Sequence, residues 1–80
     1  MKKVSIYTLE TCHYCQVAKE YFKEKGIEYT ELDAMDSNNR MEAKEKSGQL
    51  GVPVIVISDE EGGEEVIIGF DEEKIGAALA

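Results

Sequence analysis

Two cysteines separated by two residues, Cys12 and Cys15, are the only cysteines among the 80 residues of this sequence. In a helix, side chains three positions apart lie on one face, at roughly the 5 Å that a disulfide bond requires between its Cα atoms. The two thiols can therefore form and break a disulfide without a change in the backbone. This spacing points to thiol–disulfide exchange.

The position of the pair predicts a division of roles. A strand pattern ends shortly before Cys12 and a helix pattern follows it, so Cys12 is expected in the first helical turn. Free N–H groups and the positive end of the helix dipole favour a thiolate there. Cys12 is therefore predicted to be the nucleophile, and Cys15, one turn further along and less exposed, the thiol that resolves the mixed disulfide.

Two other interpretations of the pair are weaker. A permanent disulfide closing so short a loop would stabilise the fold by only about 2 kcal/mol in the chain-entropy model, and a reducing compartment would open it. A structural zinc site needs four ligands, and His13 is the only imidazole that could join the two thiols. We expect no bound metal or cofactor. His13 either adds to the stabilisation of the Cys12 thiolate or is an exposed residue that modestly tunes the potential, and Tyr14 is expected as an exposed aromatic beside it.

Charge and length restrict the remaining possibilities. The 17 acidic and 9 basic residues give a net charge of −8, which repels phosphate backbones and anionic lipid, so neither nucleic acid nor a membrane is an expected partner. The apolar stretch after Met1, Lys2 and Lys3 is too short for a signal peptide or a membrane span. We expect a cytoplasmic, monomeric protein with a single domain over residues 1–80.

Strand and helix patterns alternate along the chain. The continuous apolar run at 52–57 is typical of a strand covered on both faces, so helices must lie on both sides of the sheet. The order βαβαββα predicts an α/β fold. Strands are expected at 3–8, 27–32, 52–57 and 66–68, with a hairpin loop at 59–64, and helices at 12–25, from Asp36 or Ser37 to the stop at Ser47-Gly48, and after a cap at Asp71.

Taken together, these segments resemble the glutaredoxin branch of the thioredoxin superfamily. The resemblance implies a thioredoxin-like fold, a four-stranded mixed sheet flanked by three helices. It rests on three segments. Thr11-Cys12-His13-Tyr14-Cys15 is similar to the family's active-site segment. Lys46-Ser47-Gly48 followed by Gly51-Val52-Pro53 is similar to its turn with the cis-proline loop. Ile68-Gly69-Phe70-Asp71-Glu72 is similar to the segment that holds the γ-glutamyl carboxylate of glutathione.

The resemblance also implies contacts and partners. Substrate backbone would pair with the residue before Pro53. The residues expected to contact substrate are Thr11, His13, Tyr14, Val52, Pro53, Gly69, Phe70 and Asp71. Glutaredoxins commonly carry a basic residue where this sequence has Leu9-Glu10, and its Gly69-Phe70-Asp71 is closer to the glutaredoxin-like proteins served by thioredoxin reductase, which include electron donors of ribonucleotide reductase. The electron source is therefore either glutathione or NADPH with thioredoxin reductase.

The leading hypothesis is a thiol–disulfide oxidoreductase whose Cys-His-Tyr-Cys dithiol reduces disulfides in proteins or small molecules. Two alternatives stay open. One is a glutathione-dependent dimer that binds an iron–sulfur cluster through one Cys12 from each chain. The other is a redox-responsive binding module whose acidic surface docks a partner.

Overall fold

A computed structural model describes residues 2–48 and 51–79, within which strands and helices follow in the predicted order βαβαββα. Met1, the first residue of the amino-terminal segment considered above, lies outside these residues. No helix in the described ranges is long and apolar enough to cross a membrane. The elements are β1 (Lys3–Thr8), α1 (His13–Glu24), β2 (Thr30–Asp33), α2 (Ser37–Ser47), β3 (Val54–Ser58), β4 (Glu64–Ile68) and α3 (Glu72–Leu79).

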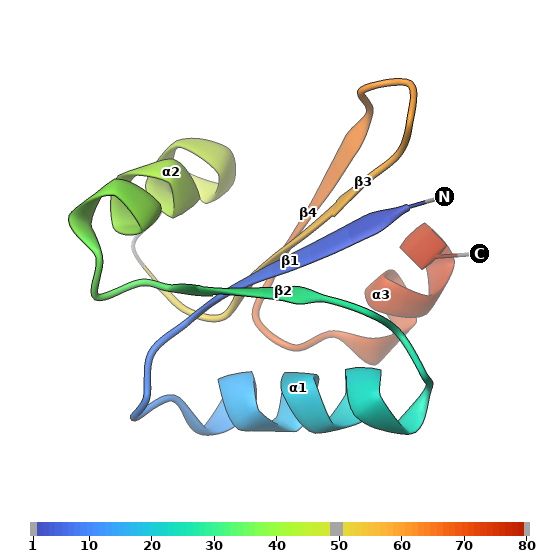
Figure 1. Ribbon diagram of the computed structural model, residues 1–80, viewed down its shortest axis with the longest axis horizontal. Coiled ribbons are helices and arrows are strands. Elements are labelled where there is room, and N and C mark those ends of the chain that lie inside the picture. The colour runs from blue at the N-terminus through green and yellow to red at the C-terminus, as the bar shows by residue number, and fades with distance from the viewer. Residues whose placement is uncertain (1, 49–50, 80) are drawn as a thin grey trace.

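The described strands form one mixed sheet in the order β2-β1-β3-β4. Strand β1 runs parallel to β2 and antiparallel to β3, and β3 is antiparallel to β4. Helices α1 and α3 cover one face of the sheet and α2 covers the other (Figure 1). The predicted thioredoxin-like arrangement, a four-stranded mixed sheet flanked by three helices, is confirmed.

The hydrophobic core has one half on each face of the sheet. Successive side chains of β3 point to opposite faces, so this strand contributes to both halves, and its apolar run is continuous for that reason. The half beneath α1 and α3 contains Val4, Ile6, Ala18, Phe22, Ile55, Ile57, Ile67 and Ile75. The half beneath α2 contains Tyr7, Ala43, Val54 and Val56.

Three strands start at residues other than those predicted, and β2 and β3 each end one residue later than predicted. Strand β2 begins at Thr30 rather than at residue 27, because the N–H of Ile27 still donates to the carbonyl of Phe22 at 2.8 Å as the chain leaves α1. Strand β3 begins at Val54 rather than at residue 52, since Pro53 has no N–H to give to a strand ladder. Strand β4 begins two residues earlier than predicted, at Glu64, which lengthens its pairing with β3.

The predicted helix signals are confirmed. The carboxylate of Asp36 accepts hydrogen bonds from the N–H groups of Asn38 and Asn39 and so caps α2. Gly48 ends that helix in the left-handed conformation, with φ of 78°, which a residue without a Cβ adopts freely. The positions of the helices along the chain therefore follow from capping chemistry that is visible in the sequence.

Candidate active site

Cys12 is the N-cap of α1, one position before the first helical turn in which it was predicted. Its backbone is extended, with φ of −85° and ψ of 111°, and its Sγ accepts a hydrogen bond from the N–H of Cys15 at 3.1 Å. In other helices a Ser, Thr, Asp or Asn oxygen takes this place. The N–H of Cys15 therefore points at the sulfur that was predicted to be the nucleophile.

The two cysteines differ in their access to solvent. Cys12 is half-buried, whereas Cys15 has no exposed surface, and both are free thiols in the structure. Burial raises the pKa of the Cys15 thiol well above its ordinary value, and the hydrogen-bonded Cys12 sulfur adds to the rise. Cys15 is thus kept as a neutral thiol behind a sulfur that substrate can reach.

The register of the sheet brings the three predicted site segments to one end. Tyr7 of β1 pairs with Val54 of β3, and Val54 pairs with Ile68 of β4, so these residues form one row across the sheet. The chain leaves β1 just beyond this row toward Cys12, enters β3 through Pro53 and leaves β4 into the third segment. The cysteine loop, the proline loop and the start of α3 therefore lie at the same end of the sheet.

The proline loop and the third segment are also joined directly. The peptide bond between Val52 and Pro53 is cis, as the resemblance implied. The N–H of Gly69 donates to the carbonyl of Pro53 at 2.9 Å. Pro53 is buried and Val52 is half-buried, so the backbone of this loop is fixed at its place in the site.

The predicted contact residues fall into an exposed group and a group that is half-buried or buried. Thr11, His13 and Tyr14 are exposed, Tyr14 by 63%, and the rings of His13 and Tyr14 meet edge to face at 5.6 Å. Phe70 is half-buried and lies edge to face with Tyr21, 5.6 Å between ring centroids. The surface that substrate can touch beside Cys12 is therefore formed mainly by the exposed group, while Phe70 anchors its own segment in the core.

The start of α3 carries negative charge from its own carboxylate side chains. The Oδ1 of Asp71 accepts a hydrogen bond from the N–H of Lys74 at 3.1 Å, which confirms the predicted cap. Glu72 and Glu73 occupy the first turn of the helix. On the cysteine side of the site, Glu10 is exposed. A ligand with carboxylates of its own would meet these charges as it approached.

Comparison with known proteins agrees with this geometry. The family model described as glutaredoxin matches residues 4–61. The chain belongs to the glutaredoxin family. It is 37% identical over 73 residues to an uncharacterized glutaredoxin-like 8.6 kDa protein in the rubredoxin operon of Clostridium pasteurianum, a match that covers 90% of this chain and 91% of the relative.

Other members of the glutaredoxin family are similar over shorter or longer stretches. The chain is 44% identical over 59 residues to glutaredoxin 3 of Escherichia coli K12, covering 71% of this chain and 70% of that protein. The crystal structure of a glutaredoxin from Archaeoglobus fulgidus superposes with a TM-score of 0.82 at 25% identity, over 99% of this chain and 87% of the other. Membership in this family supports thiol–disulfide exchange as the class of reaction.

The sequence patterns of this glutaredoxin-family chain do not predict one cluster beside the site, formed by Glu31, Thr8 and Lys19. The carboxylate of Glu31 accepts hydrogen bonds from the hydroxyl of Thr8 at 2.8 Å and from the ammonium of Lys19 at 2.9 Å. Lysine side chains are usually exposed, yet that of Lys19 is only 18% exposed. The spacing of four residues from Cys15 to Lys19 was the available signal, because it puts both residues on one helix face.

These three residues line a groove beside the cysteine helix. The groove has a volume of about 350 Å³, and its other lining residues are Glu10, Gln16 and Asp33. The hydrogen bonds from Lys19 and then Thr8 lower the pKa of Glu31, so the carboxylate is held in its charged form. The groove therefore contains an ion pair that is fixed next to the helix bearing both thiols.

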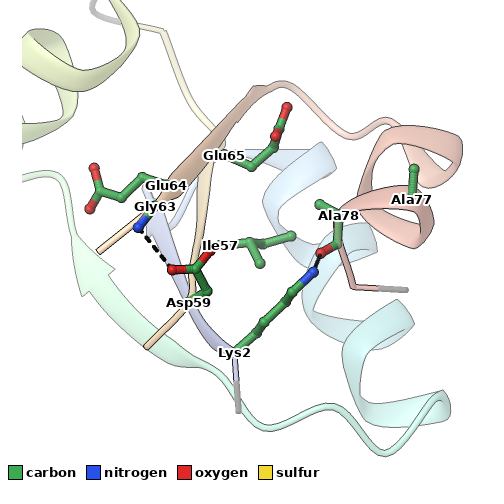
Figure 2. Close-up of a pocket in the computed structure, with 8 residues that line it drawn as sticks. All are labelled: Lys2, Ile57, Asp59, Gly63, Glu64, Glu65, Ala77 and Ala78. Carbon is green, nitrogen blue, oxygen red and sulfur yellow. Dashed lines mark hydrogen bonds between the residues drawn. The ribbon is translucent and has the colours of Figure 1, made fainter. Parts of the chain in front are cut away.

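A second hollow lies at the opposite end of the sheet (Figure 2). It has a volume of about 300 Å³, and in it Lys2 reaches the carbonyl of Ala78 while the N–H of Gly63 donates to the carboxylate of Asp59 at 2.8 Å. Its lining residues include neither a thiol nor an imidazole. Across residues 2–48 and 51–79, moreover, no three His, Cys, Asp or Glu side chains come together as they would to hold a metal ion.

Proposed function

We propose that this chain is a dithiol reductant of disulfides in proteins and small molecules, with Cys12 as nucleophile and Cys15 as resolving thiol. The observation that carries the proposal is the hydrogen bond from the N–H of Cys15 to the Sγ of Cys12, together with the burial of Cys15 behind it. An accessible, stabilised sulfur next to a protected one is what a two-step exchange requires.

The reaction proceeds in two exchanges. The Cys12 thiolate attacks one sulfur of the substrate disulfide, and the other substrate sulfur leaves as a thiolate that takes up a proton. Cys15 then loses its proton and attacks the Sγ of Cys12. The second substrate sulfur leaves, and two electrons have passed from the dithiol to the substrate. Substrate backbone pairs with Val52, and Tyr14 provides contact area beside the sulfur.

We propose further that NADPH with thioredoxin reductase resets the Cys12–Cys15 disulfide more efficiently than glutathione does. Glutathione carries two carboxylates, and Glu10, exposed before Cys12, repels them, as do Asp71 and Glu72 at the start of α3. The cycle belongs in the cytoplasm, where a reducing environment maintains the dithiol. Proteins with redox-active disulfides, ribonucleotide reductase among them, are the proposed substrates.

The test of the dithiol mechanism is a trapping experiment. The Cys15→Ser variant should form a stable mixed disulfide between Cys12 and a disulfide-containing protein, visible as a reducible band of summed mass. Cys12→Ser is the matched control and should trap nothing. Full turnover by Cys15→Ser on protein disulfides would show that the second cysteine is dispensable, and the proposal would be wrong.

The electron source is tested by reducing the oxidised protein in parallel, with NADPH and thioredoxin reductase in one reaction and with glutathione and glutathione reductase in the other. Faster reduction through thioredoxin reductase supports the proposal. Faster reduction by glutathione would contradict it and would show that the acidic residues around the site do not repel this ligand.

A further inference from the structure

The resolving step faces an obstacle that the cysteine pair alone does not remove. Cys15 has no exposed surface, and it must lose a proton before it can attack Cys12. A thiolate in an apolar site is disfavoured because it loses the solvation that water provides. A nearby group must therefore compensate the negative charge on the Cys15 sulfur before Cys15 attacks the mixed disulfide.

Lys19 is placed to do so. It follows Cys15 by four residues, so the two side chains lie on one face of α1, one turn apart. Its side chain is 18% exposed, and its ammonium is held by the carboxylate of Glu31 at 2.9 Å. The hydroxyl of Thr8, a buried residue at the end of β1, holds the same carboxylate oxygen at 2.8 Å. Glu31 of β2 thus holds the ammonium directly, and Thr8 of β1 holds the carboxylate of Glu31.

The groups that act on Cys15 are few. On its own helix they are the sulfur of Cys12 and the ammonium of Lys19, and from the preceding loop the backbone of Leu9 forms a hydrogen bond to it. Burial raises the pKa of Cys15, whereas the backbone hydrogen bond of Leu9 and then the positive charge of Lys19 act in the opposite direction. The carboxylates of Glu10, Glu31 and Asp33 also line the groove that contains the ammonium.

We propose that Lys19 stabilises the thiolate of Cys15 during the resolving step, and that Glu31 and Thr8 are positioning residues that hold its ammonium in place. The inference rests on the proposed function and adds residues to it. In this step the proton of Cys15 passes to solvent and its sulfur bonds to the Sγ of Cys12. The bond between Cys12 and the substrate sulfur breaks, and that sulfur leaves with the electron pair.

The two exchanges can be followed separately with a chromogenic aromatic disulfide, 5,5′-dithiobis(2-nitrobenzoate), in stopped flow. Attack by Cys12 releases the first coloured thiolate, and attack by Cys15 releases the second. In Lys19→Met the first phase should be unchanged, while the second should slow about threefold to tenfold near neutral pH. Loss of the nearby positive charge lowers the thiolate fraction of Cys15, and the higher nucleophilicity of the remaining thiolate offsets part of that loss. The midpoint of its pH–rate profile should move upward.

Matched variants separate this role from a structural one. Lys19→Arg keeps the charge and should restore the second phase and its midpoint. Lys23→Met removes an exposed cation one turn further along α1 and should leave both phases unchanged. Lys19→Gln is measured alongside, so that the result does not depend on the folding of one variant.

The outcomes distinguish the inference from the function on which it rests. A wild-type protein with no first phase, or no second phase, would overturn the dithiol mechanism itself. A wild-type protein with both phases, and Lys19 variants whose second phase and pH midpoint match it, would overturn only the role of Lys19.

Discussion

The backbone N–H of Cys15 lies 3.1 Å from the Sγ of Cys12 and donates a hydrogen bond to it. In the mechanism that we propose, the residue that attacks the mixed disulfide also supports the nucleophile through its backbone, while its own thiol stays buried. The main chain and the side chain of Cys15 would then serve different steps of the reaction.

The exposed ring of Tyr14 should matter for protein substrates and little for small ones. Replacing Tyr14 by Ala removes contact area beside Cys12 from a side chain that is 63% exposed, so the free energy of unfolding should hardly change. We expect kcat/KM for a disulfide-containing protein to fall about threefold to tenfold, as for a contact residue near the centre of an interface. Met41→Ala, equally exposed but on α2, is the control. Equal effects of the two variants would argue against docking at Tyr14.

Reversing the charge at Glu10 should improve the use of glutathione. In Glu10→Lys, an exposed cation replaces an exposed carboxylate just before Cys12, so we expect the rate of reduction by glutathione to rise about threefold to tenfold at low salt and less at high salt. Glu20→Lys makes the same charge change on an exposed position of α1 and should have little effect. The prediction is wrong if both variants respond alike, since a general charge effect would then explain the data.

The cap of α3 links stability to the site. Replacing Asp71 by Ala removes the acceptor for the N–H of Lys74 and should lower the free energy of unfolding by about 1 kcal/mol, whereas Asp71→Asn should retain most of it. Thermal unfolding measures the loss. Asp36→Ala removes the cap of α2 and should destabilise by a similar amount without changing disulfide reduction. If Asp71→Asn lost as much stability as Asp71→Ala, capping would not be the role of this side chain.

Alkaline pH should weaken the fold through Tyr7. Burial, followed by the hydrogen bond to Glu42 at 2.8 Å, raises the pKa of Tyr7 from 10.0 to about 12. Above the ordinary pKa the unfolded chain releases a proton that the folded chain retains, so stability falls as pH rises toward the folded value. The full loss is about 3 kcal/mol.

Urea unfolding at about pH 8 and about pH 11.5 measures this dependence, which follows from proton linkage. Tyr7→Phe should be less stable at the lower pH, because it lacks the hydrogen bond, but its stability should change less between the two conditions. Tyr14→Phe, at an exposed position, should keep the wild-type pH dependence. An unchanged slope in Tyr7→Phe would assign the alkaline loss to other groups.

The order of elements and the caps were predictable because they depend on local chemistry. The apolar run of β3 predicts that both faces of the sheet are covered. Asp36 marks the start of α2 because its side chain caps the helix, and Gly48 marks the end because it has no side chain to oppose the left-handed conformation. Strand starts were less predictable. Ile27 has the composition of a strand residue, but its N–H is taken by the carbonyl of Phe22, a contact that only the folded chain supplies.

The same division holds for the site. The cysteine pair, the cis proline and the cap at Asp71 were visible as motifs, although Cys12 lies one position before the helical turn expected for it. The ion pair of Lys19 with Glu31 was not visible in the sequence. Its partners come from α1 and β2, and β2 reaches this position only through its parallel pairing with β1. Long-range partnerships of this kind depend on register, which single-residue patterns do not encode.

The central position of β3 also has a consequence for hydrogen exchange. Val54, Ile55, Val56 and Ile57 are buried, and the strand is paired on both sides, so its amides should exchange with deuterium only when the whole molecule opens. The amides of Thr11 and His13, at the exposed end of the sheet, should exchange through small local openings. Cys15 is buried within α1 while Cys12 is the half-buried cap of that helix, so the boundary between slowly and rapidly exchanging amides should lie between these two residues.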